Sequence, residues 1–157
     1  MDIKVAMAQI NPKTGDLEGN TRMIVRGIQR AQEQRADLVV FPEMCLTGYC
    51  LDEKLLFNRE LLSENKRRLY TEIAPACREV SAVVGFVDFE AGRTGPDLQP
   101  IRYNAAAVIH RAEVVDTVHK RLLPAYRYFD DKRYFQPGRR VEPVRLDFRT
   151  ARLASEC

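Results

Sequence analysis

The pattern of apolar and polar positions predicts that the chain begins with a strand, a helix and a second strand. Residues 3–10 alternate and then become apolar, as a β-strand does, and the turn-forming residues 11–16 follow them. Apolar positions then recur at helical spacing as far as about Gln34, and Asn20 is the expected N-cap of this helix. A second strand begins near Leu38. Because a helix connects the two strands, we expect them to be parallel within one sheet.

The middle of the chain has the pattern of a broken helix followed by another strand. Residues 63–80 have helical spacing, and Pro75 predicts a break near Ala74, because proline removes an intrahelical hydrogen bond. Residues 82–89 are apolar enough for a buried strand. Residues 90–100 are polar and contain glycine and proline, so we expect a loop there.

Two more apolar runs, at 103–110 and 114–119, are separated by a connection of hairpin length and predict an antiparallel pair. Three consecutive alanines at 105–107 leave room for a closely packed layer, and a second sheet is the expected occupant. Residues 141–148 predict one more short strand. Since no linker interrupts these elements, we expect an α/β fold class and a single domain over residues 1–157.

Length and composition place the chain among ordinary globular proteins. A chain of 157 residues can bury one core, and 45% hydrophobic with 30% charged residues excludes the disordered and membrane-spanning classes. The amino terminus lacks the charged-then-apolar layout of a secretory signal, so we expect a cytoplasmic location. In that compartment the four cysteines would be free thiols.

Charge and histidine content predict neither a nucleic-acid surface nor a metal site. The net charge of +3 is mild, and the basic clusters at 66–68 and 139–140 are short and scattered, which is typical of solvated faces. His110 and His119 lack any recognised ligand spacing. We therefore expect both histidines to be structural or surface residues, and no metal.

The first candidate for chemistry is Glu43, within the stretch LVVFPEMCLTGY at residues 38–49. A buried strand ends at a proline, and the next residue is this glutamate. Apolar Met44 and Leu46 predict partial desolvation of the carboxylate, which suits it to accept a proton at the strand exit, where open α/β sheets place their chemistry. The alternative from these residues alone is a solvated turn, because most glutamates are exposed.

A second charged residue, Lys120, also follows an apolar strand and opens the stretch KRLLPAYRYFDDKRYFQPG at residues 120–138. The two stretches together resemble the glutamate and lysine motifs of the nitrilase, or carbon–nitrogen hydrolase, superfamily. Residues 9–20 and the YNAA sequence at 103–106 add a similarity to the amino-terminal glutaminase domain of glutamine-dependent NAD synthetases. The resemblance implies a nitrilase-like α-β-β-α sandwich, of which this chain would supply the first half and a little more.

The resemblance also implies roles for individual residues. In this superfamily a cysteine thiolate attacks an amide or nitrile carbon, a glutamate serves as general base and a lysine stabilises the charged intermediate. Glu43 matches the base and Lys120 the cation. Asp131 stands where the family has a second carboxylate, usually a glutamate that is one methylene longer. Tyr126 matches a position near the bound amide substrate, and the alternative for it is a packing tyrosine.

The nucleophile is unknown from the sequence. The family places it in a strand that ends Ile-Cys-Glu-Asp, whereas this chain ends ARLASEC. Cys157 lies near the expected place, but its neighbours differ, so we do not expect it to be a working nucleophile. We expect instead a domain that is incomplete at its C-terminus, and an isolated chain that is inactive and self-associates through exposed sheet edges into a homo-oligomer.

Three hypotheses for function follow. The first is glutamine hydrolysis that supplies ammonia for ATP-dependent NAD synthesis. The second keeps the hydrolase chemistry but acts on another amide, nitrile or carbamoyl substrate, and the third is a catalytically silent nitrilase-like scaffold. The amidase chemistry needs no cofactor, and ATP and Mg²⁺ would belong to a synthetase domain, because this chain contains no Ser-Gly-Gly-x-Asp-Ser phosphate loop.

Overall fold

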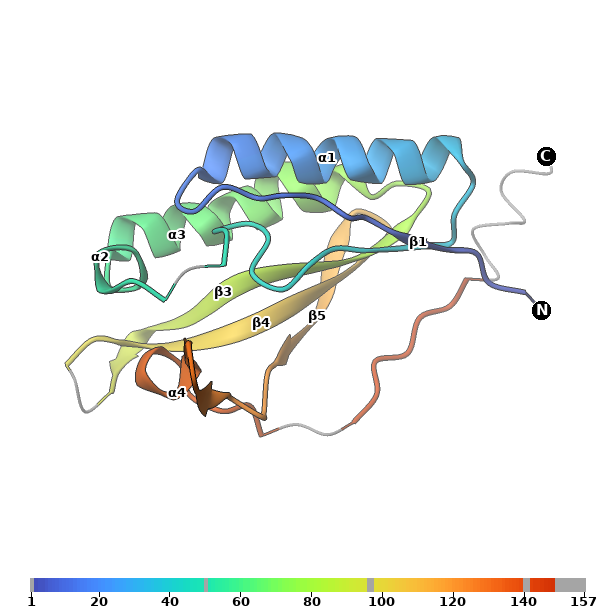
Figure 1. Ribbon diagram of the computed structural model, residues 1–157. Helices are drawn as coiled ribbons and strands as arrows, with labels where there is room; N and C mark the ends of the chain where they lie inside the picture. The colour runs from blue at the N-terminus through green and yellow to red at the C-terminus, as the bar shows by residue number, and fades with distance from the viewer. Residues whose placement is uncertain (1, 50, 96–97, 140–141, 149–157) are drawn as a thin grey trace.

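The computed structural model describes residues 2–49, 51–95, 98–139 and 142–148, and a five-stranded mixed sheet lies at its centre (Figure 1). The strands follow one another in chain order: β1 (Val5–Met7), β2 (Leu38–Val40), β3 (Ser81–Thr94), β4 (Pro100–His110) and β5 (Glu113–His119). The first three strands are parallel, as expected for β1 and β2, and β4 is antiparallel to both of its neighbours. Consequently β2 and β5 point the same way, and their carboxyl ends lie at the same edge of the sheet.

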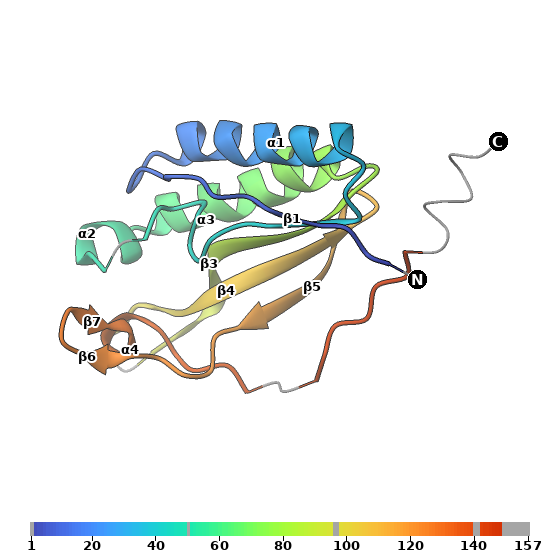
Figure 2. The same ribbon diagram turned by 45° about the vertical axis from the view of Figure 1, so that its right-hand side comes forward.

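Helices cover one face of this sheet. The helical elements are α1 (Leu17–Glu33), α2 (Glu53–Leu56), α3 (Arg59–Arg68), the π-helical turn η1 (Leu69–Ile73), the 3-10 turn η2 (Ala74–Ala76) and α4 (Asp131–Tyr134). In both ribbon views α1 and α3 lie on one side, and α4 lies on the other side with the small ladder of β6 (Ala125–Tyr126) and β7 (Phe129–Asp130) (Figures 1 and 2). The α/β prediction is confirmed. The described residues form only this two-stranded ladder in addition to the main sheet.

The main core fills the space between the sheet and the helices. Ile24 and Ile28 of α1 are fully buried there, in a cluster that also contains Ala105 and Ala107 of β4. The prediction that the alanine run faces a second sheet is therefore wrong for these two residues, because strand alternation turns them toward the helices. Only Ala106, opposite Gly85 in the ladder, is left for the other face.

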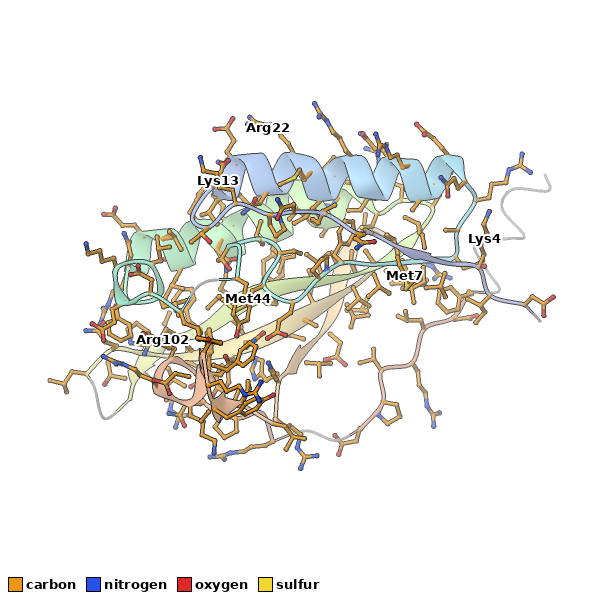
Figure 3. All side chains as sticks on the ribbon, viewed as in Figure 1. Lys4, Met7, Lys13, Arg22, Met44 and Arg102 are labelled. Carbon is orange, nitrogen blue, oxygen red and sulfur yellow. The ribbon has the colours of Figure 1, made fainter. Side chains whose placement is uncertain are left out.

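A second apolar cluster joins the two sides at one end of the sheet. Met44, labelled in Figure 3, is fully buried in it beside Val87, and the cluster also contains Leu56 of α2, Leu62 of α3, Tyr134 of α4, Leu123 and Phe135. Arg102, also labelled, is only 3% exposed, since its guanidinium donates to the carbonyl oxygens of Tyr134 and Pro100 at 3.1 and 2.9 Å. Met7 on the outermost strand is 88% exposed and points away from both clusters.

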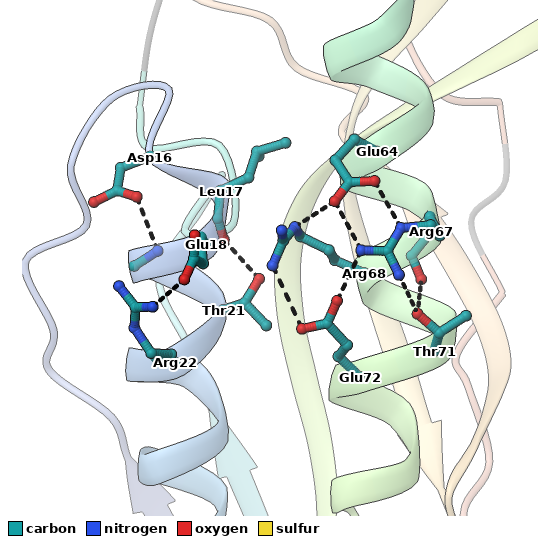
Figure 4. Close-up of polar contacts among 11 residues, drawn as sticks. Asp16, Leu17, Glu18, Thr21, Arg22, Glu64, Arg67, Arg68, Thr71 and Glu72 are labelled. Atoms are coloured by element: carbon teal, nitrogen blue, oxygen red, sulfur yellow. Dashed lines mark hydrogen bonds and ion pairs between the residues drawn. The ribbon is translucent and has the colours of Figure 1, made fainter.

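The N-cap of α1 differs from the prediction. The cap is Asp16, whose carboxylate accepts a hydrogen bond from the Gly19 amide at 2.9 Å, so the helix begins three residues before Asn20 (Figure 4). Asn20 is instead fully buried within the helix, where its amide donates to the carbonyl oxygens of Lys13 and Leu46. Asn20 therefore lies inside the first turn of α1, where its side chain binds the segment that follows β2.

Three other boundaries differ from the sequence pattern. The helix predicted at 63–80 begins earlier, at Arg59, and its break near Ala74 is confirmed by the change from a π-helical to a 3-10 turn. β3 continues to Thr94 through part of the expected loop, because β4 pairs with it there. No strand forms in the described part of the predicted strand at 141–148, where residues 142–148 are irregular; Val141 lies outside the described residues.

The basic cluster at 66–68 is matched by acidic residues of the same helical layer. Arg67 pairs with Glu64 and Glu72 at 2.6 and 2.9 Å, and Arg68 reaches the same two carboxylates (Figure 4). These charged side chains form ion pairs on the surface of α3 and η1, as expected for a solvated face. Among the described residues no helix is long and apolar enough to cross a membrane.

Candidate active site

The loop after β2 carries Glu43 over the neighbouring strand. Phe41 donates its amide to Val83 of β3 at 2.9 Å, and Leu46 donates to Gly85 at 3.2 Å, so the loop is attached to β3 on both sides of Glu43. Met44 adopts a left-handed backbone, with φ at 50°, which directs the apolar side chains inward while Glu43 faces outward. The Glu43 side chain is 44% exposed while Met44 and Leu46 are fully buried, and the expected desolvation of its carboxylate stays a prediction.

Gly85 makes this crossing possible. A Cβ atom at Gly85 would lie 2.3 Å from the Pro42 oxygen and 2.5 Å from the Met44 nitrogen, distances that no real contact has. The backbone of the Glu43 loop therefore occupies the place that a side chain on β3 would take. As a result Glu43 reaches the region of β4 and β5, although two strands separate β2 from β5 in the sheet.

Lys120 comes from the exit of β5, and its backbone is paired on both sides. Its amide donates to the Asn104 oxygen at 2.8 Å, and its oxygen accepts from the Gly138 amide at 2.9 Å. The ammonium lies 2.7 Å from Glu43 Oε1 and 3.1 Å from Asp131 Oδ2. The structure thus brings the three predicted charged residues, Glu43, Lys120 and Asp131, into one cluster.

Asp131 is the buried member of the cluster, with a side chain that is 0% exposed. It begins α4, where its amide donates to the Pro124 oxygen at 3.0 Å. Its Oδ1 accepts a hydrogen bond from the Tyr49 hydroxyl at 3.0 Å, while Oδ2 faces Lys120. A buried carboxylate is tolerated where both oxygens have partners, and here a cation and a phenol provide them.

The two carboxylates set the protonation of their neighbours. Burial by itself lowers the pKa of Lys120, but its hydrogen bonds and charge attraction to Glu43 and Asp131 outweigh burial and raise the pKa overall. Lys120 is therefore a fixed cation at neutral pH. Burial, and then the hydrogen bond to Asp131, raise the pKa of Tyr49, which keeps the phenol protonated as a donor.

Asn104 is the neutral residue of the cluster. Its side chain, 3% exposed, donates to Glu43 Oε1, the same oxygen that receives the Lys120 ammonium. Among the described residues no donor reaches Glu43 Oε2. Asn104 and Tyr49 are not among the predicted site residues. The available signals were a polar residue within the apolar strand of residues 103–110, and a tyrosine in the same stretch as Glu43.

Tyr126 lies beside the cluster without joining it. Its side chain on β6 is 63% exposed, and its ring meets the edge of Phe129 at 5.6 Å between centroids. Phe129 in turn meets Tyr49 at 6.5 Å. An aromatic series therefore leads from Tyr126 to the residue that holds Asp131, and the predicted contact of Tyr126 with substrate stays a prediction.

The described cysteines are unsuited to attack a substrate. Cys45, two residues after Glu43, is fully buried, donates its thiol to the Gly85 oxygen at 3.3 Å, and has its pKa raised by burial to about 12. Cys77 is also fully buried, and burial raises its pKa to about 12. Cys157 lies outside the described residues, so its predicted inactivity stays a prediction.

Both histidines are engaged in structural contacts, as expected. His119 Nε2 lies 2.8 Å from Asp88 Oδ2, and its ring stacks on Tyr103 at 3.9 Å between centroids. His110 Nδ1 lies 2.8 Å from the Ser81 hydroxyl. Among the residues that the structure describes, no group of three or more His, Cys, Asp or Glu side chains is arranged to hold a metal ion.

Comparison with known proteins decides the family. The family model described as carbon-nitrogen hydrolase matches residues 4–155. The chain belongs to the carbon–nitrogen hydrolase family. The chain is 35% identical over 146 residues to the glutamine-dependent NAD(+) synthetase of Thermotoga maritima, a match that covers 92% of the chain and 23% of that protein.

Solved structures agree with the family. The chain matches glutamine-dependent NAD+ synthetase from Acinetobacter baumannii with a TM-score of 0.75 and 33% identity, over 89% of the chain and 25% of that protein. It matches an amidase from Nesterenkonia sp. with a TM-score of 0.72 and 24% identity, over 93% of the chain and 52% of the amidase, which shows the fold alone. The nitrilase-like fold is therefore confirmed. The chain spans about a quarter of the length of the NAD synthetases that it matches.

Proposed function

We propose that this carbon–nitrogen hydrolase domain serves to hydrolyse the side-chain amide of glutamine and to supply the ammonia for ATP-dependent NAD synthesis. The observation that carries the proposal is the cluster in which Lys120 contacts Glu43 at 2.7 Å and Asp131 at 3.1 Å. The similarity to glutamine-dependent NAD synthetases supports glutamine as the substrate. The ATP-dependent step would take place in a synthetase domain outside this chain.

Each charged residue has a distinct part in the proposed reaction. Glu43 accepts the proton of a cysteine thiol, and the thiolate adds to the amide carbon of glutamine to give a tetrahedral oxyanion. Lys120 stabilises the developing negative charge, while Asp131 keeps this ammonium in place. Glu43 then gives the proton to the leaving nitrogen, ammonia departs, and water hydrolyses the resulting thioester to glutamate and the free thiol.

The nucleophile in this proposal comes from outside the described residues, because Cys45 and Cys77 are buried away from the cluster. A cysteine nucleophile is what the resemblance of the Glu43 and Lys120 motifs to the nitrilase superfamily implies for this chemistry. The Glu43 side chain is 44% exposed, and no donor from the described residues reaches its Oε2. A thiol delivered from the rest of the domain can therefore approach that carboxylate from the open side.

The test measures ammonia release from glutamine by the complete gene product, alongside a panel of other amides and nitriles. We expect turnover of glutamine, and a loss of at least about 10³-fold in Glu43→Gln, since removal of a catalytic base removes both proton transfers. Glu18→Gln is the matched control, because Glu18 lies on exposed helix surface and pairs, among the described residues, with Arg22. Turnover of another amide with none of glutamine would transfer the proposal to the second substrate class. Full activity in Glu43→Gln would refute it.

A further inference from the structure

The contact of Asn104 with Glu43 has a consequence for how the carboxylate works. Both donors that reach Glu43, the Lys120 ammonium and the Asn104 amide, converge on Oε1. A carboxylate oxygen that already accepts two hydrogen bonds, one from a cation, is the poorer site for a proton. The second oxygen, Oε2, has no donor among the described residues and belongs to a side chain that is 44% exposed.

We infer that Asn104 is a positioning residue that, together with Lys120, holds Glu43 by Oε1 and so makes Oε2 the oxygen that takes and returns the proton. This inference rests on the proposed function for its catalytic consequence. The geometric part stands on the contacts alone. Asn104 is not a catalytic residue in this account, since it acts through Glu43.

The backbone of Asn104 strengthens the argument. The same residue accepts the Lys120 amide through its carbonyl oxygen, at 2.8 Å, and donates to Glu43 through its side chain. It lies on β4, opposite Val87 of β3, two positions along from the pair formed by Gly85 and Ala106. One rigid strand residue thus fixes the spacing between the two charged groups that the loop after β2 and the exit of β5 provide.

An amide is the side chain that this position requires. Asn offers an N–H donor and no charge, whereas an aspartate of the same shape would place a second carboxylate against Glu43. Two carboxylates in contact cannot both ionise easily, so one of them holds a proton to higher pH. Among the described residues, Lys120 contacts Glu43 directly, Asp131 shares that ammonium and the Tyr49 phenol donates to Asp131, and the exchange replaces none of these three residues.

The experiment compares Asn104→Asp and Asn104→Ala with Asn65→Ala in the complete gene product. Asn65 is a matched control, because it is also fully buried and donates its amide to an oxygen, but that oxygen is the Val87 carbonyl at 2.6 Å. For Asn104→Asp we expect the acidic limb of the kcat/KM profile for glutamine to move up by about one pH unit or more. We expect kcat at neutral pH to fall at least about tenfold, with KM changed less than threefold. Asn65→Ala lowers the thermal midpoint and leaves the acidic limb in place.

A second readout does not depend on turnover. The protein is labelled with ¹³C at the side-chain carboxyl carbon of its glutamates and observed by NMR. The signal of Glu43 is the one that is missing from the spectrum of Glu43→Gln. The titration midpoint of this signal should rise in Asn104→Asp. It should rise less in Asn104→Ala, because that variant removes the hydrogen-bond donor without adding a charge. Asn104→Ala alone tests the inference if the aspartate variant does not fold. If the wild-type protein does not hydrolyse glutamine, the proposed function fails while this titration still tests Asn104. Midpoints equal to the wild-type value in both variants, or an acidic limb that Asn65→Ala moves equally, would overturn the inference.

Discussion

Gly85→Ala should disrupt the cluster without touching any of its side chains. The new methyl group would lie 2.3 Å from the Pro42 oxygen and 2.5 Å from the Met44 nitrogen, both of which are backbone atoms that cannot rotate away. An ordinary contact begins near 3.4 Å, so the loop that carries Glu43 must move by about 1 Å. Such a shift strains or breaks the hydrogen bond that Leu46 donates to Gly85 at 3.2 Å.

The expected cost follows from these contacts. Overpacking in a closely packed interior costs about 1–3 kcal/mol, and a weakened backbone hydrogen bond adds about 1 kcal/mol. Replacing glycine also restricts the unfolded chain, which offsets about 0.4–1 kcal/mol. We therefore expect the free energy of unfolding to fall by about 1–3.5 kcal/mol in Gly85→Ala. A 1 Å displacement of Glu43 should in addition lower glutamine turnover about 10²-fold.

The assay is urea unfolding followed by circular dichroism, with the ammonia assay for turnover. Gly92→Ala is the matched control, because Gly92 lies on the same strand and a Cβ there meets nothing within 4 Å. This control should be neutral or stabilised by up to about 1 kcal/mol. Equal stability and equal turnover in the two variants would refute the crossing of the Glu43 loop over Gly85.

Three further predictions concern the neighbours of the cluster. Tyr49→Phe removes the donor to the buried Oδ1 of Asp131 and should lower the free energy of unfolding, measured in urea, by about 1–3 kcal/mol. The control Tyr128→Phe changes a side chain that is 92% exposed and should leave the free energy of unfolding unchanged. Equal effects of the two variants would contradict the hydrogen bond between Tyr49 and Asp131. The pKa of Lys120 is raised above 10.5 in the folded state, so its stabilising contribution is complete below that pH and is lost as the pH rises through the folded pKa. The stability difference between the wild type and Lys120→Met should therefore shrink when unfolding is measured from pH 8 to above pH 10.5, and a constant difference would show that the ion pairs do not form. Cys45 should resist iodoacetamide at pH 8 in the folded protein and react in urea, as read by mass spectrometry, because burial raises its pKa to about 12; equal rates in both states would place the thiol at the surface.

The sequence pattern was sufficient for the five strands of the main sheet and for the charged residues at strand exits, but it did not predict α2, α4 or the β6–β7 ladder. Glu43 and Lys120 come shortly after strands of three and seven residues, β2 and β5, and local pattern reveals such exits. The parallel pair at the amino terminus and the antiparallel pair of β4 and β5 follow from connection length alone. Asp131 came from the family resemblance, since the pattern around it does not distinguish a buried carboxylate from an exposed one.

Contacts across the sheet could not be predicted in the same way. In the sequence, Asn104 is one polar residue in an apolar strand. Its contact with Glu43 depends on Gly85, which allows the Glu43 loop to cross β3. That crossing follows from the register of the strands and not from the local sequence. Asn20 is a residue type that commonly caps helices, and only the capping position of Asp16 reveals that Asn20 lies inside the helix. The exposure of Glu43 likewise depends on the left-handed backbone of Met44, which no hydrophobic pattern indicates.

The most direct test of the account is a double-mutant cycle of glutamine turnover with Glu43→Gln and Lys120→Met in the complete gene product. If the carboxylate and the ammonium act as one unit, the double variant should lose little more activity than the worse single variant, because either change already disables the proton transfer and charge stabilisation that depend on their 2.7 Å contact. Losses that multiply independently, or single variants that retain wild-type turnover, would contradict a shared catalytic centre.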